Sequence, residues 1–318
     1  MNIVSRPPRV MADGPLASII VEALAGEVEW LPWVTGLESP REDVDGLYTY
    51  GHPKVDAAML ANLPNLRVVS NYGVGVDHIE LKAAAERNVP VGNTPGILDG
   101  ATADMGFTLL LATARRLVEG DRYARSAGFT TYDPGYMLGR EVHSSTLGII
   151  GLGRIGLQVA KRAQGFDMTV QYYNRRPRPE VEEMYGLRYA TLDHLLATSD
   201  YVMLCCPLTT ETRHIINADT LKKMKPTATL INLARGGVVD TQALYEALRD
   251  HKIAAAGLDV TEPEPLPREH PLLKLDNVVI APHLGSATIE TRRRMAEMSI
   301  ENLRAGLAGQ PLPHEVKV

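Results

Sequence analysis

The stretch from residue 147 to 176 constrains the fold of this chain most, because it contains a strand, a glycine-rich turn, a helix and a second strand in succession. The apolar run 147–150 is typical of a buried strand, and Gly151, Gly153 and Gly156 then form a G-x-G-x-x-G motif. In this context the motif predicts a unit that binds a dinucleotide, with the phosphates at the helix N-terminus. The first glycine permits a sharp turn, the second lets the backbone approach the pyrophosphate, and the third lets helix and strand pack closely. The alternative is that the glycines serve packing only.

The residues after the second strand favour NADP over NAD. NAD-binding units usually carry Asp or Glu about twenty residues after the glycines, where it binds the ribose 2′-hydroxyl. This chain has Asn174 there, followed by Arg175 and Arg176. No carboxylate would repel a 2′-phosphate at this point, and two guanidiniums can bind one. The alternative is that both arginines belong to a solvated turn before Pro177.

Length and composition are those of an ordinary globular protein of about two domains. The net charge, 33 − 38 = −5, gives no reason to expect nucleic acid as a partner. Cys205 and Cys206 are adjacent and lie in an apolar run, so we expect buried thiols in a reducing compartment. No apolar stretch reaches the length of about eighteen residues that predicts a membrane span, and no signal-peptide pattern is seen. A soluble, cytoplasmic protein without a membrane partner is expected.

Short apolar runs alternate with helical patterns along the chain, which predicts an α/β fold with parallel sheets. Residues 1–98 show this alternation before the dinucleotide unit and are therefore expected to form a separate domain. A segment without a pattern, 128–143, is either a subunit contact or a surface loop. The expected helices are 17–24, 55–61, 81–87, 101–124, 192–197, 218–224, 241–248 with Asp240 as N-cap, and 286–307 with Ser286 or Thr288 as N-cap. The expected strands are 46–50, 67–70, 89–91, 147–150, 168–173, 201–206, 229–233, 254–260 and 278–281.

Three predicted strands are followed by side chains suited to one reaction. Arg235 follows the strand 229–233, Glu264 follows 254–260, and His283 follows 278–281. In a doubly wound sheet, ligands bind beyond the carboxyl ends of the strands. A histidine can donate the proton that a carbonyl needs after hydride transfer, a carboxylate can orient it, and an arginine can polarise the carbonyl. Taken singly, each residue has an ordinary alternative as a surface charge, a solvated loop residue or a packed histidine.

Six motifs, in their order and spacing, resemble those of the D-isomer-specific 2-hydroxyacid dehydrogenases. Within this family the chain looks most like the glyoxylate/hydroxypyruvate reductases, through segments 174–179, 265–273 and 309–313. The six motifs are NYGVGVDH at 71–78, NTPG at 93–96, the glycine turn at 151–156, NLARGGVVD at 232–240, AGLDVTEPEP at 256–265 and APHLGS at 281–286.

The resemblance implies two Rossmann-like, doubly wound parallel-sheet domains, one inserted into the other. The dinucleotide-binding domain would take residues 99–286, and a discontinuous substrate-binding domain would take 1–98 and 287–318. Hinges near Pro95 and Gly285 would let a cleft close on the substrate. The resemblance also implies a homodimer through the cofactor domain, with the helix from 101 and the segment 128–143 at the contact.

The same resemblance implies a role for each site residue. Arg235 would bind the substrate carboxylate and carbonyl oxygen, His283 would donate the proton in reduction, and Glu264 would hydrogen-bond His283. The backbone amides of Val74 and Gly75 would also bind the substrate carboxylate. Among the cofactor contacts, Asp259 would face the nicotinamide amide and Thr102 the phosphates; no metal is expected. The full set of expected cofactor contacts is Thr102, Gly151, Gly153, Arg154, Ile155, Gly156, Asn174, Arg175, Arg176, Pro207, Thr212, Leu233, Ala234, Asp259 and Gly285.

The expected function is NADPH-dependent reduction of small 2-oxoacids such as glyoxylate and hydroxypyruvate, with NAD as a possible second cofactor. Glu264 argues against a formate dehydrogenase, because those relatives carry glutamine there. The same chemistry on 2-ketogluconate, aromatic 2-oxoacids or phosphite stays open, as does a dinucleotide-sensing, corepressor-like binding protein without catalysis. The loop 48–52 is expected to line the pocket, where His52 either touches substrate or is merely exposed.

Overall fold

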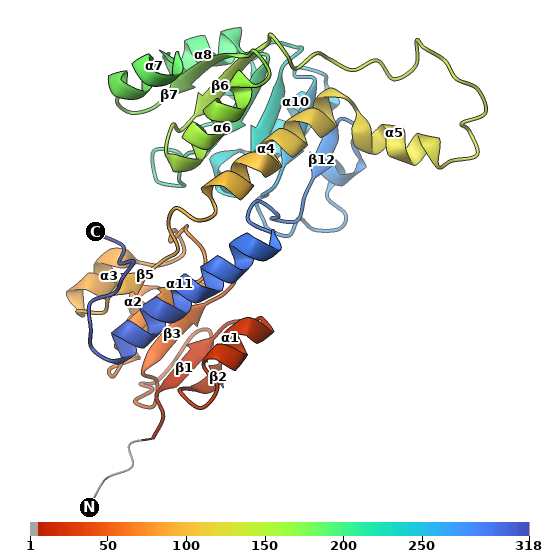
Figure 1. The fold of residues 1–318 in the computed structure, drawn as a ribbon. Coiled ribbons are helices and arrows are strands. Elements are labelled where there is room, and N and C mark those ends of the chain that lie inside the picture. The colour runs from red at the N-terminus through yellow and green to blue at the C-terminus, as the bar shows by residue number, and fades with distance from the viewer. Residues whose placement is uncertain (1–5, 318) are drawn as a thin grey trace, which may run out of the picture. The chain divides into compact units, whose positions relative to one another are not determined.

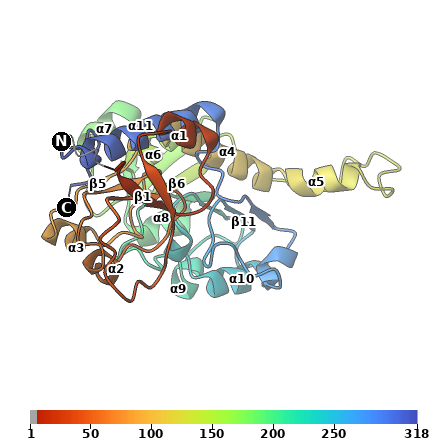
Figure 2. The same ribbon diagram turned by 90° about the horizontal axis from the view of Figure 1, so that it is seen from below.

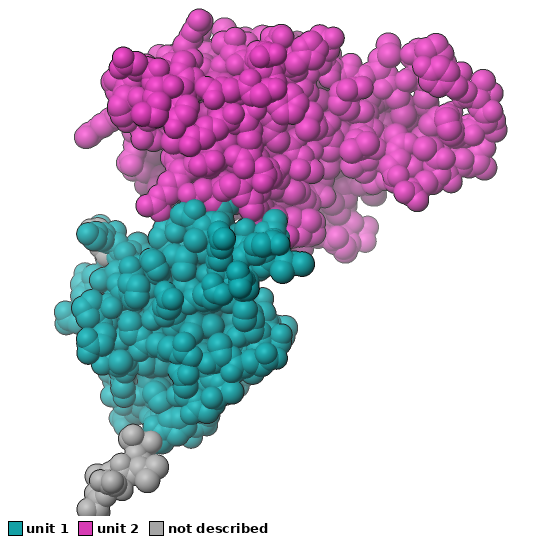
Figure 3. Space-filling model, viewed as in Figure 1, with its two compact units in different colours: residues 1–98, 288–318 teal, residues 99–287 magenta. Residues whose placement is uncertain are grey.

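The protein is built from two parallel sheets, each covered by helices on both faces (Figure 1). This computed structural model describes residues 6–317. The chain divides into two compact units (Figure 3): unit 1 takes the chain up to Leu98 and from Thr288 onward, and unit 2 runs from Asp99 to Ala287. All pairings between the named strands are parallel. The predicted α/β fold class with two parallel-sheet units is confirmed.

Unit 1 contains a five-stranded sheet in the order β2-β1-β3-β4-β5. Leu47 and Val69 lie in the core cluster that α2 and α3 complete on one face. Their strand neighbours Tyr48 and Ser70 point the other way, toward α11, as the two-residue period of a strand requires. The strands are β1 (Arg9–Ala12), β2 (Glu29–Pro32), β3 (Gly46–Thr49), β4 (Val68–Asn71) and β5 (Val91–Gly92). The helices are α1 (Ser18–Ala23), α2 (Ala57–Ala61), α3 (Leu81–Glu86) and α11 (Ile289–Leu307).

The C-terminal helix α11 belongs to the core of unit 1. Thr288 is its N-cap and accepts a hydrogen bond from the Thr291 amide at 3.1 Å, which decides between the two caps that the sequence allowed. The Tyr48 hydroxyl lies 2.7 Å from the Ser299 hydroxyl, and the Ser70 hydroxyl donates to the Ser299 carbonyl at 2.7 Å. Both contacts are buried, so this face of the sheet depends on residues more than two hundred positions later in the chain.

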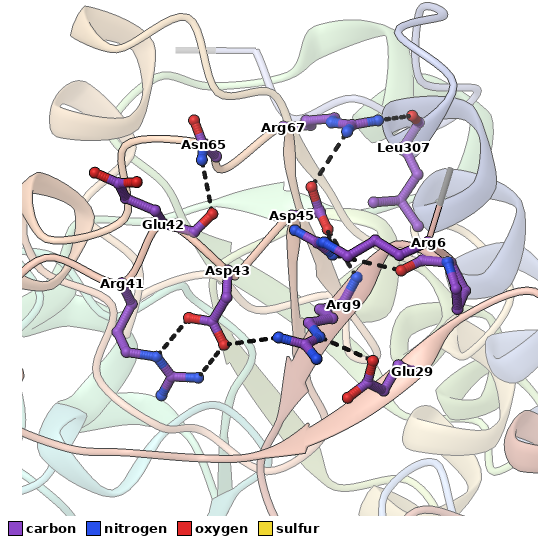
Figure 4. A network of polar contacts seen from close by, with 11 residues as sticks. Arg6, Arg9, Glu29, Arg41, Glu42, Asp43, Asp45, Asn65, Arg67 and Leu307 are labelled. Carbon is purple, nitrogen blue, oxygen red and sulfur yellow. Dashed lines mark hydrogen bonds and ion pairs between the residues drawn. The ribbon is translucent and has the colours of Figure 1, made fainter. Parts of the chain in front are cut away.

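A network of charged residues lies where β1, β3 and β4 begin (Figure 4). The Asp45 carboxylate, whose side chain is only 6% exposed, accepts from the Arg9 amide at 2.8 Å, from Arg6 at 2.8 Å and from Arg67 at 3.2 Å. Asp43 lies at the more exposed side of the network, where the hydrogen bond from Arg41 lowers the pKa of its carboxyl to about 2. Asp45 therefore ties together the starts of three strands.

Replacing Asp45 with asparagine should lower the free energy of unfolding by about 1–2 kcal/mol. The amide keeps the shape but loses the charge that faces two guanidiniums, and their exposure keeps the loss at the lower end. Urea unfolding followed by circular dichroism measures the change. Asp43→Asn, at a side chain that is 35% exposed, is the matched control and should cost less than about 1 kcal/mol. Equal losses in the two variants would contradict a special role for Asp45.

Unit 2 contains a seven-stranded sheet in the order β12-β11-β10-β9-β6-β7-β8. Helices α4 and α6 pack on one face, where Tyr201 and Met203 contribute to the core, and α8, α9 and α10 cover the other, where Val202 and Leu204 contribute. The strands are β6 (Thr146–Ile150), β7 (Thr169–Tyr173), β8 (Arg188–Tyr189), β9 (Tyr201–Leu204), β10 (Thr229–Asn232), β11 (Ala255–Leu258) and β12 (Val278–Ile280). The helices are α4 (Asp99–Ala114), α5 (Leu117–Ala124), α6 (Arg154–Gln164), α7 (Pro179–Tyr185), α8 (Leu192–Thr198), α9 (Ala218–Leu221) and α10 (Thr241–Arg249), with short 3-10 turns at Gly236–Val238 and Pro271–Lys274.

The single helix predicted over 101–124 is wrong, because the chain bends between α4 and α5. Arg116 has a left-handed backbone with φ 51°, and the carbonyl of Ala114 accepts a hydrogen bond from the Arg140 amide at 2.8 Å. The last carbonyl of α4 is therefore bound by the segment around Arg140 instead of by a further helical turn. Figures 1 and 2 both show α5 and the segment 128–143 projecting from the rest of unit 2. That segment contains no helix or strand, as expected.

Over residues 6–317, no helix has both the length and the apolar character needed to cross a membrane. In the same residues, no group of three or more His, Cys, Asp or Glu side chains is placed to hold a metal ion.

Candidate functional site

The glycine turn follows β6, the strand at which the strand order of the unit 2 sheet reverses. From β6 the chain first adds β7 and β8 on one side and then adds β9 to β12 on the other side. Doubly wound sheets bind their ligands at such a switch point. Gly151 has φ 99°, and a Cβ there would lie 2.5 Å from the Cys206 amide nitrogen, while a Cβ at Gly156 would collide with the Gly151 carbonyl. A Cβ at Gly153 would meet nothing within 4 Å.

These surroundings fit the three expected roles of the glycines. The first and third permit tight packing, and the second leaves open space at the N-terminus of α6, whose first residues are Arg154 and Ile155. A helix N-terminus with open backbone in front of it suits a pyrophosphate. Cys206 is buried behind the turn as expected, whereas Cys205 is only partly buried.

The segment after β7 turns back on the glycine turn. The Asn174 side-chain oxygen accepts a hydrogen bond from the Leu152 amide at 2.7 Å, and Arg178 donates to the Leu152 carbonyl at 3.0 Å. Arg175 and Arg176 are exposed. Arg178 was not among the expected cofactor contacts. It could have been included, because it is the third arginine within a few residues of the end of β7.

Arg175 lies close enough to the loop that follows β9 to affect a carboxyl group there. The Thr209 hydroxyl is the main cause that lowers the pKa of the Glu211 carboxyl, and Arg175 adds a smaller contribution. In the same loop, Thr212 donates to the Pro207 carbonyl at 2.6 Å. Pro207 and Thr212 are therefore part of one compact loop at the carboxyl end of β9.

The three candidate catalytic residues follow three neighbouring strands, β10, β11 and β12. Glu264 Oε1 lies 2.7 Å from His283 Nδ1, so the structure brings these two side chains together as expected. Asn232 holds the turn that carries Arg235, because its side chain accepts from the Ala234 amide at 3.0 Å and donates to the Arg235 carbonyl at 3.0 Å. Asn232 was expected only as part of the NLARGGVVD motif, and its side chain shapes the turn that precedes Arg235.

Asp259 holds the turn that carries His283. Its buried carboxylate accepts from the amides of Leu284 at 2.6 Å and Gly285 at 2.8 Å, and its carbonyl accepts from the His283 amide at 2.9 Å. Burial raises the pKa of the Asp259 carboxyl. Thr102 lies beside this turn, since a Cβ added at Gly285 would lie 3.3 Å from Thr102 Cγ2. Thr102, Asp259 and Gly285 thus form one group next to the Glu264–His283 pair.

The remaining expected cofactor residues, Leu233 and Ala234, are buried directly after β10. All of the expected cofactor residues therefore lie in unit 2, and most follow the carboxyl end of a strand. The expected site residues did not include Arg213, His214 and Glu262, whose side chains contact one another in the loops after β9 and β11.

In unit 1, two asparagines shape the loop after β4. Asn71 donates to the carbonyls of Gly73 at 2.8 Å and Gly75 at 2.9 Å, and Asn93 donates to the Val74 carbonyl at 2.8 Å. These bonds fix the carbonyl side of the loop. Within residues 6–317, the amides of Val74 and Gly75 donate to no backbone or side-chain acceptor, so this loop presents two backbone donors.

The loop after β3 is held by a carboxylate. Asp13 accepts from the amides of Tyr50 at 2.5 Å and Gly51 at 2.7 Å, and the Tyr50 ring packs against Tyr72 with 4.7 Å between centroids. His52 is exposed, with its ring edge-on to another ring of unit 1, that of His78, at 5.1 Å.

Comparisons with known proteins point to one family. The D-isomer specific 2-hydroxyacid dehydrogenase, NAD binding domain, family matches residues 107–285. The glyoxylate reductase of Pyrococcus horikoshii is 46% identical over 96% of this chain and 95% of that protein, and that of Korarchaeum cryptofilum is 49% identical over 86% and 83%.

Solved structures agree with the sequence relatives. A protein from Thermus thermophilus is 44% identical with a TM-score of 0.87, over 97% of this chain and 100% of that one. An NADPH-dependent glyoxylate/hydroxypyruvate reductase from Sinorhizobium meliloti, crystallised with NADP and malonate, is 32% identical with a TM-score of 0.86, over 97% and 96%. The resemblance drawn from the six motifs is confirmed.

Proposed function

We propose that this chain, which belongs to the D-isomer specific 2-hydroxyacid dehydrogenase family, reduces small 2-oxoacids such as glyoxylate and hydroxypyruvate with NADPH. Family membership makes the protein an oxidoreductase that uses a nicotinamide dinucleotide, and relatives named glyoxylate reductases support 2-oxoacids as its substrates. The observation that carries the proposal is the Glu264–His283 contact of 2.7 Å at the carboxyl ends of β11 and β12. A histidine held by a carboxylate is suited to deliver a proton to a carbonyl oxygen.

Each residue then has a defined task. When bound, the dinucleotide supplies the hydride. Glu264 holds Nδ1 of His283, so Nε2 is the ring nitrogen that gives its proton to the substrate oxygen. Arg235 pairs with the substrate carboxylate and polarises the carbonyl. The amides of Val74 and Gly75 bind the same carboxylate.

The preference for NADPH rests on the end of β7. Asn174 replaces the carboxylate typical of NAD-binding units, and its side-chain oxygen is engaged by the Leu152 amide. Arg175 and Arg176 are exposed beside it and are the guanidiniums we assign to the 2′-phosphate.

An assay with purified protein, NADPH and glyoxylate tests the proposal through loss of the nicotinamide absorbance. We expect turnover with glyoxylate and hydroxypyruvate, and faster turnover with NADPH than with NADH. The panel should include 2-ketogluconate and phenylpyruvate, because the same residues would reduce them and the pocket shape decides between them. The proposal fails if no 2-oxoacid of the panel is reduced with either cofactor.

We also propose a homodimer formed through unit 2. The projecting α5 and segment 128–143 carry large apolar side chains that are each at least 50% exposed, more than a monomer usually shows in one place. A monomer mass in sedimentation velocity would contradict the proposal. The exposed apolar side chains that we place at the dimer contact are Leu117, Phe129, Tyr132, Tyr136 and Leu138.

A further inference from the structure

A second carboxylate, two residues before Glu264, connects the loops that carry the site. Glu262 receives both terminal nitrogens of Arg213, at 3.0 and 3.2 Å, and its Oε2 lies 3.2 Å from Nε2 of His214. Arg213 and His214 belong to the loop after β9, whereas Glu262 follows β11. A two-pronged contact of this kind fixes orientation as well as distance, because the guanidinium is planar.

The backbone around Glu262 is held on its other side as well. The Thr241 hydroxyl donates to the Glu262 carbonyl at 2.7 Å, and the Thr261 hydroxyl donates to the Pro263 carbonyl at 2.9 Å. Glu262 is therefore attached to neighbouring elements through both its carbonyl and its side chain, two residues before Glu264, which contacts His283.

The same cluster touches the turn that carries Arg235. A Cβ at Gly237 would lie 2.9 Å from Arg213 Nη1 and 3.0 Å from Glu262 Oε1, and the His214 amide donates to the Gly237 carbonyl at 2.9 Å. At Gly236, the residue after Arg235, a Cβ would collide with the Thr261 carbonyl. Three loops, after β9, β10 and β11, thus meet at Glu262.

The charge of Glu262 is maintained by its partners. Burial alone would raise the pKa of this carboxyl, but the hydrogen bonds from Arg213 and His214 outweigh burial and lower it. The side chains of Glu262, Arg213 and His214 are 36%, 50% and 38% exposed, so the cluster is only partly shielded from water. At neutral pH it is an ionised carboxylate facing a guanidinium and an imidazole.

We infer that Glu262 is a positioning residue for the reduction: held by Arg213 and His214, it sets the spacing between Arg235 and the Glu264–His283 pair. The inference rests on the proposed function for the reaction it serves. Arg235 lies one residue before the Gly236-Gly237 turn, and Glu264 lies two residues after Glu262, so a shift of the cluster moves both. A misplacement on the scale of an ångström can cost about 10²-fold in rate even when no reacting group is lost.

The test compares Glu262→Gln and Arg213→Lys with the wild type. Glu262→Gln keeps the length of the side chain but loses its charge. Arg213→Lys keeps the charge but loses the planar guanidinium. We expect kcat for glyoxylate reduction with NADPH to fall by about 10- to 100-fold while KM changes by less than about threefold, because Arg235 remains to bind the substrate. Glu262→Asp, which restores the charge, should recover part of kcat.

The matched control is another two-pronged ion pair between an arginine and a glutamate, in unit 1. Arg304 contacts both oxygens of Glu27 at 2.8 and 2.7 Å, with 46% and 47% exposed side chains. Glu27→Gln should leave kcat unchanged. Thermal unfolding of all variants separates loss of folded protein from loss of rate. A fall in kcat that matches the fall in folded fraction, or a kcat within twofold of wild type in Glu262→Gln, would overturn the inference.

A readout without turnover distinguishes this inference from the proposed function. The Cε1–H resonance of His283, assigned by its loss in His283→Gln, reports the surroundings of the ring in the free protein. We expect its chemical shift at a fixed pH to change in Glu262→Gln and to stay unchanged in Glu27→Gln. If the wild type reduces no 2-oxoacid, the proposed function fails, and the resonance still decides whether Glu262 positions His283.

Discussion

Replacing His283 with glutamine should lower kcat for glyoxylate reduction by about 10²- to 10⁴-fold, the range that a positioned proton donor contributes. Glutamine keeps a polar group of similar reach but has no proton to transfer at neutral pH. Glu264, 2.7 Å from the ring in the native protein, would then face an amide and have no acid to orient. KM should change little, because the substitution leaves Arg235, the residue that we propose binds the substrate carboxylate, unchanged.

Stopped-flow measurement of NADPH consumption at saturating substrate gives the size of this loss. His251→Gln is a suitable control, because His251 shares the left-handed backbone of His283, with φ 50° against 56°, but lies between α10 and the amino end of β11 rather than after the carboxyl end of a strand. The control corrects for any strain that the substitution brings to such a backbone. A His283→Gln enzyme that keeps more than about a tenth of wild-type kcat would contradict the role of His283 as proton donor.

Replacing Arg175 and Arg176 together with alanine should lower kcat/KM for NADPH by about 10²-fold and leave the value for NADH within about threefold. A hydrogen bond to a charged group contributes about 1.5–3 kcal/mol, and both side chains are exposed, so we expect the lower end for each. NADH has no 2′-phosphate and loses nothing when the guanidiniums are removed. The ratio of the two kcat/KM values is therefore the quantity to measure.

The exposed Arg188 provides the control for this prediction, because its replacement removes one positive charge from β8, the strand next to β7 at the edge of the sheet. Arg188→Ala should change both cofactors equally and slightly. Equal losses with NADPH and NADH in the double variant would show that Arg175 and Arg176 do not recognise the phosphate. The glycine turn and Arg178, which contacts the Leu152 carbonyl, would then be the parts that bind either dinucleotide.

The sequence predicted most of the sheet of unit 2, because its strands are buried on both faces and read as apolar runs. Helices with a clear cap were also located well: Asp240 accepts from the Ala243 amide at 3.0 Å, as its position before α10 predicted. Strands β1 and β2 were missed, because four residues that include a charge give no periodic pattern. The helix α7 and the two-residue strand β8 were missed as well, although Pro179 at the first position of α7 and Gly186 after its end are ordinary helix signals.

Residues at strand ends could be predicted, and contacts between distant loops could not. Arg235, Glu264 and His283 follow apolar runs, and the rule that ligands bind at the carboxyl ends of parallel strands selects them. The contact between Arg213 and Glu262 joins positions 49 residues apart and depends on how two loops pack. The break between α4 and α5 could not be predicted for the same reason. It involves a hydrogen bond from the Arg140 amide to the Ala114 carbonyl, and Arg140 lies in a different segment of the chain.

The place of α11 in unit 1 has a consequence for synthesis on the ribosome. The sheet face that carries Tyr48 and Ser70 is covered by Ser299, so the first hundred residues emerge without the helix that buries them. At ordinary rates of translation, the intervening residues take on the order of 10–40 s to appear. Unit 2 is one continuous segment of the chain and can fold during that time. Unit 1 is thus the last to be completed. A nascent chain that stops before α11 keeps unit 2 but leaves its first 98 residues open to chaperones and proteases.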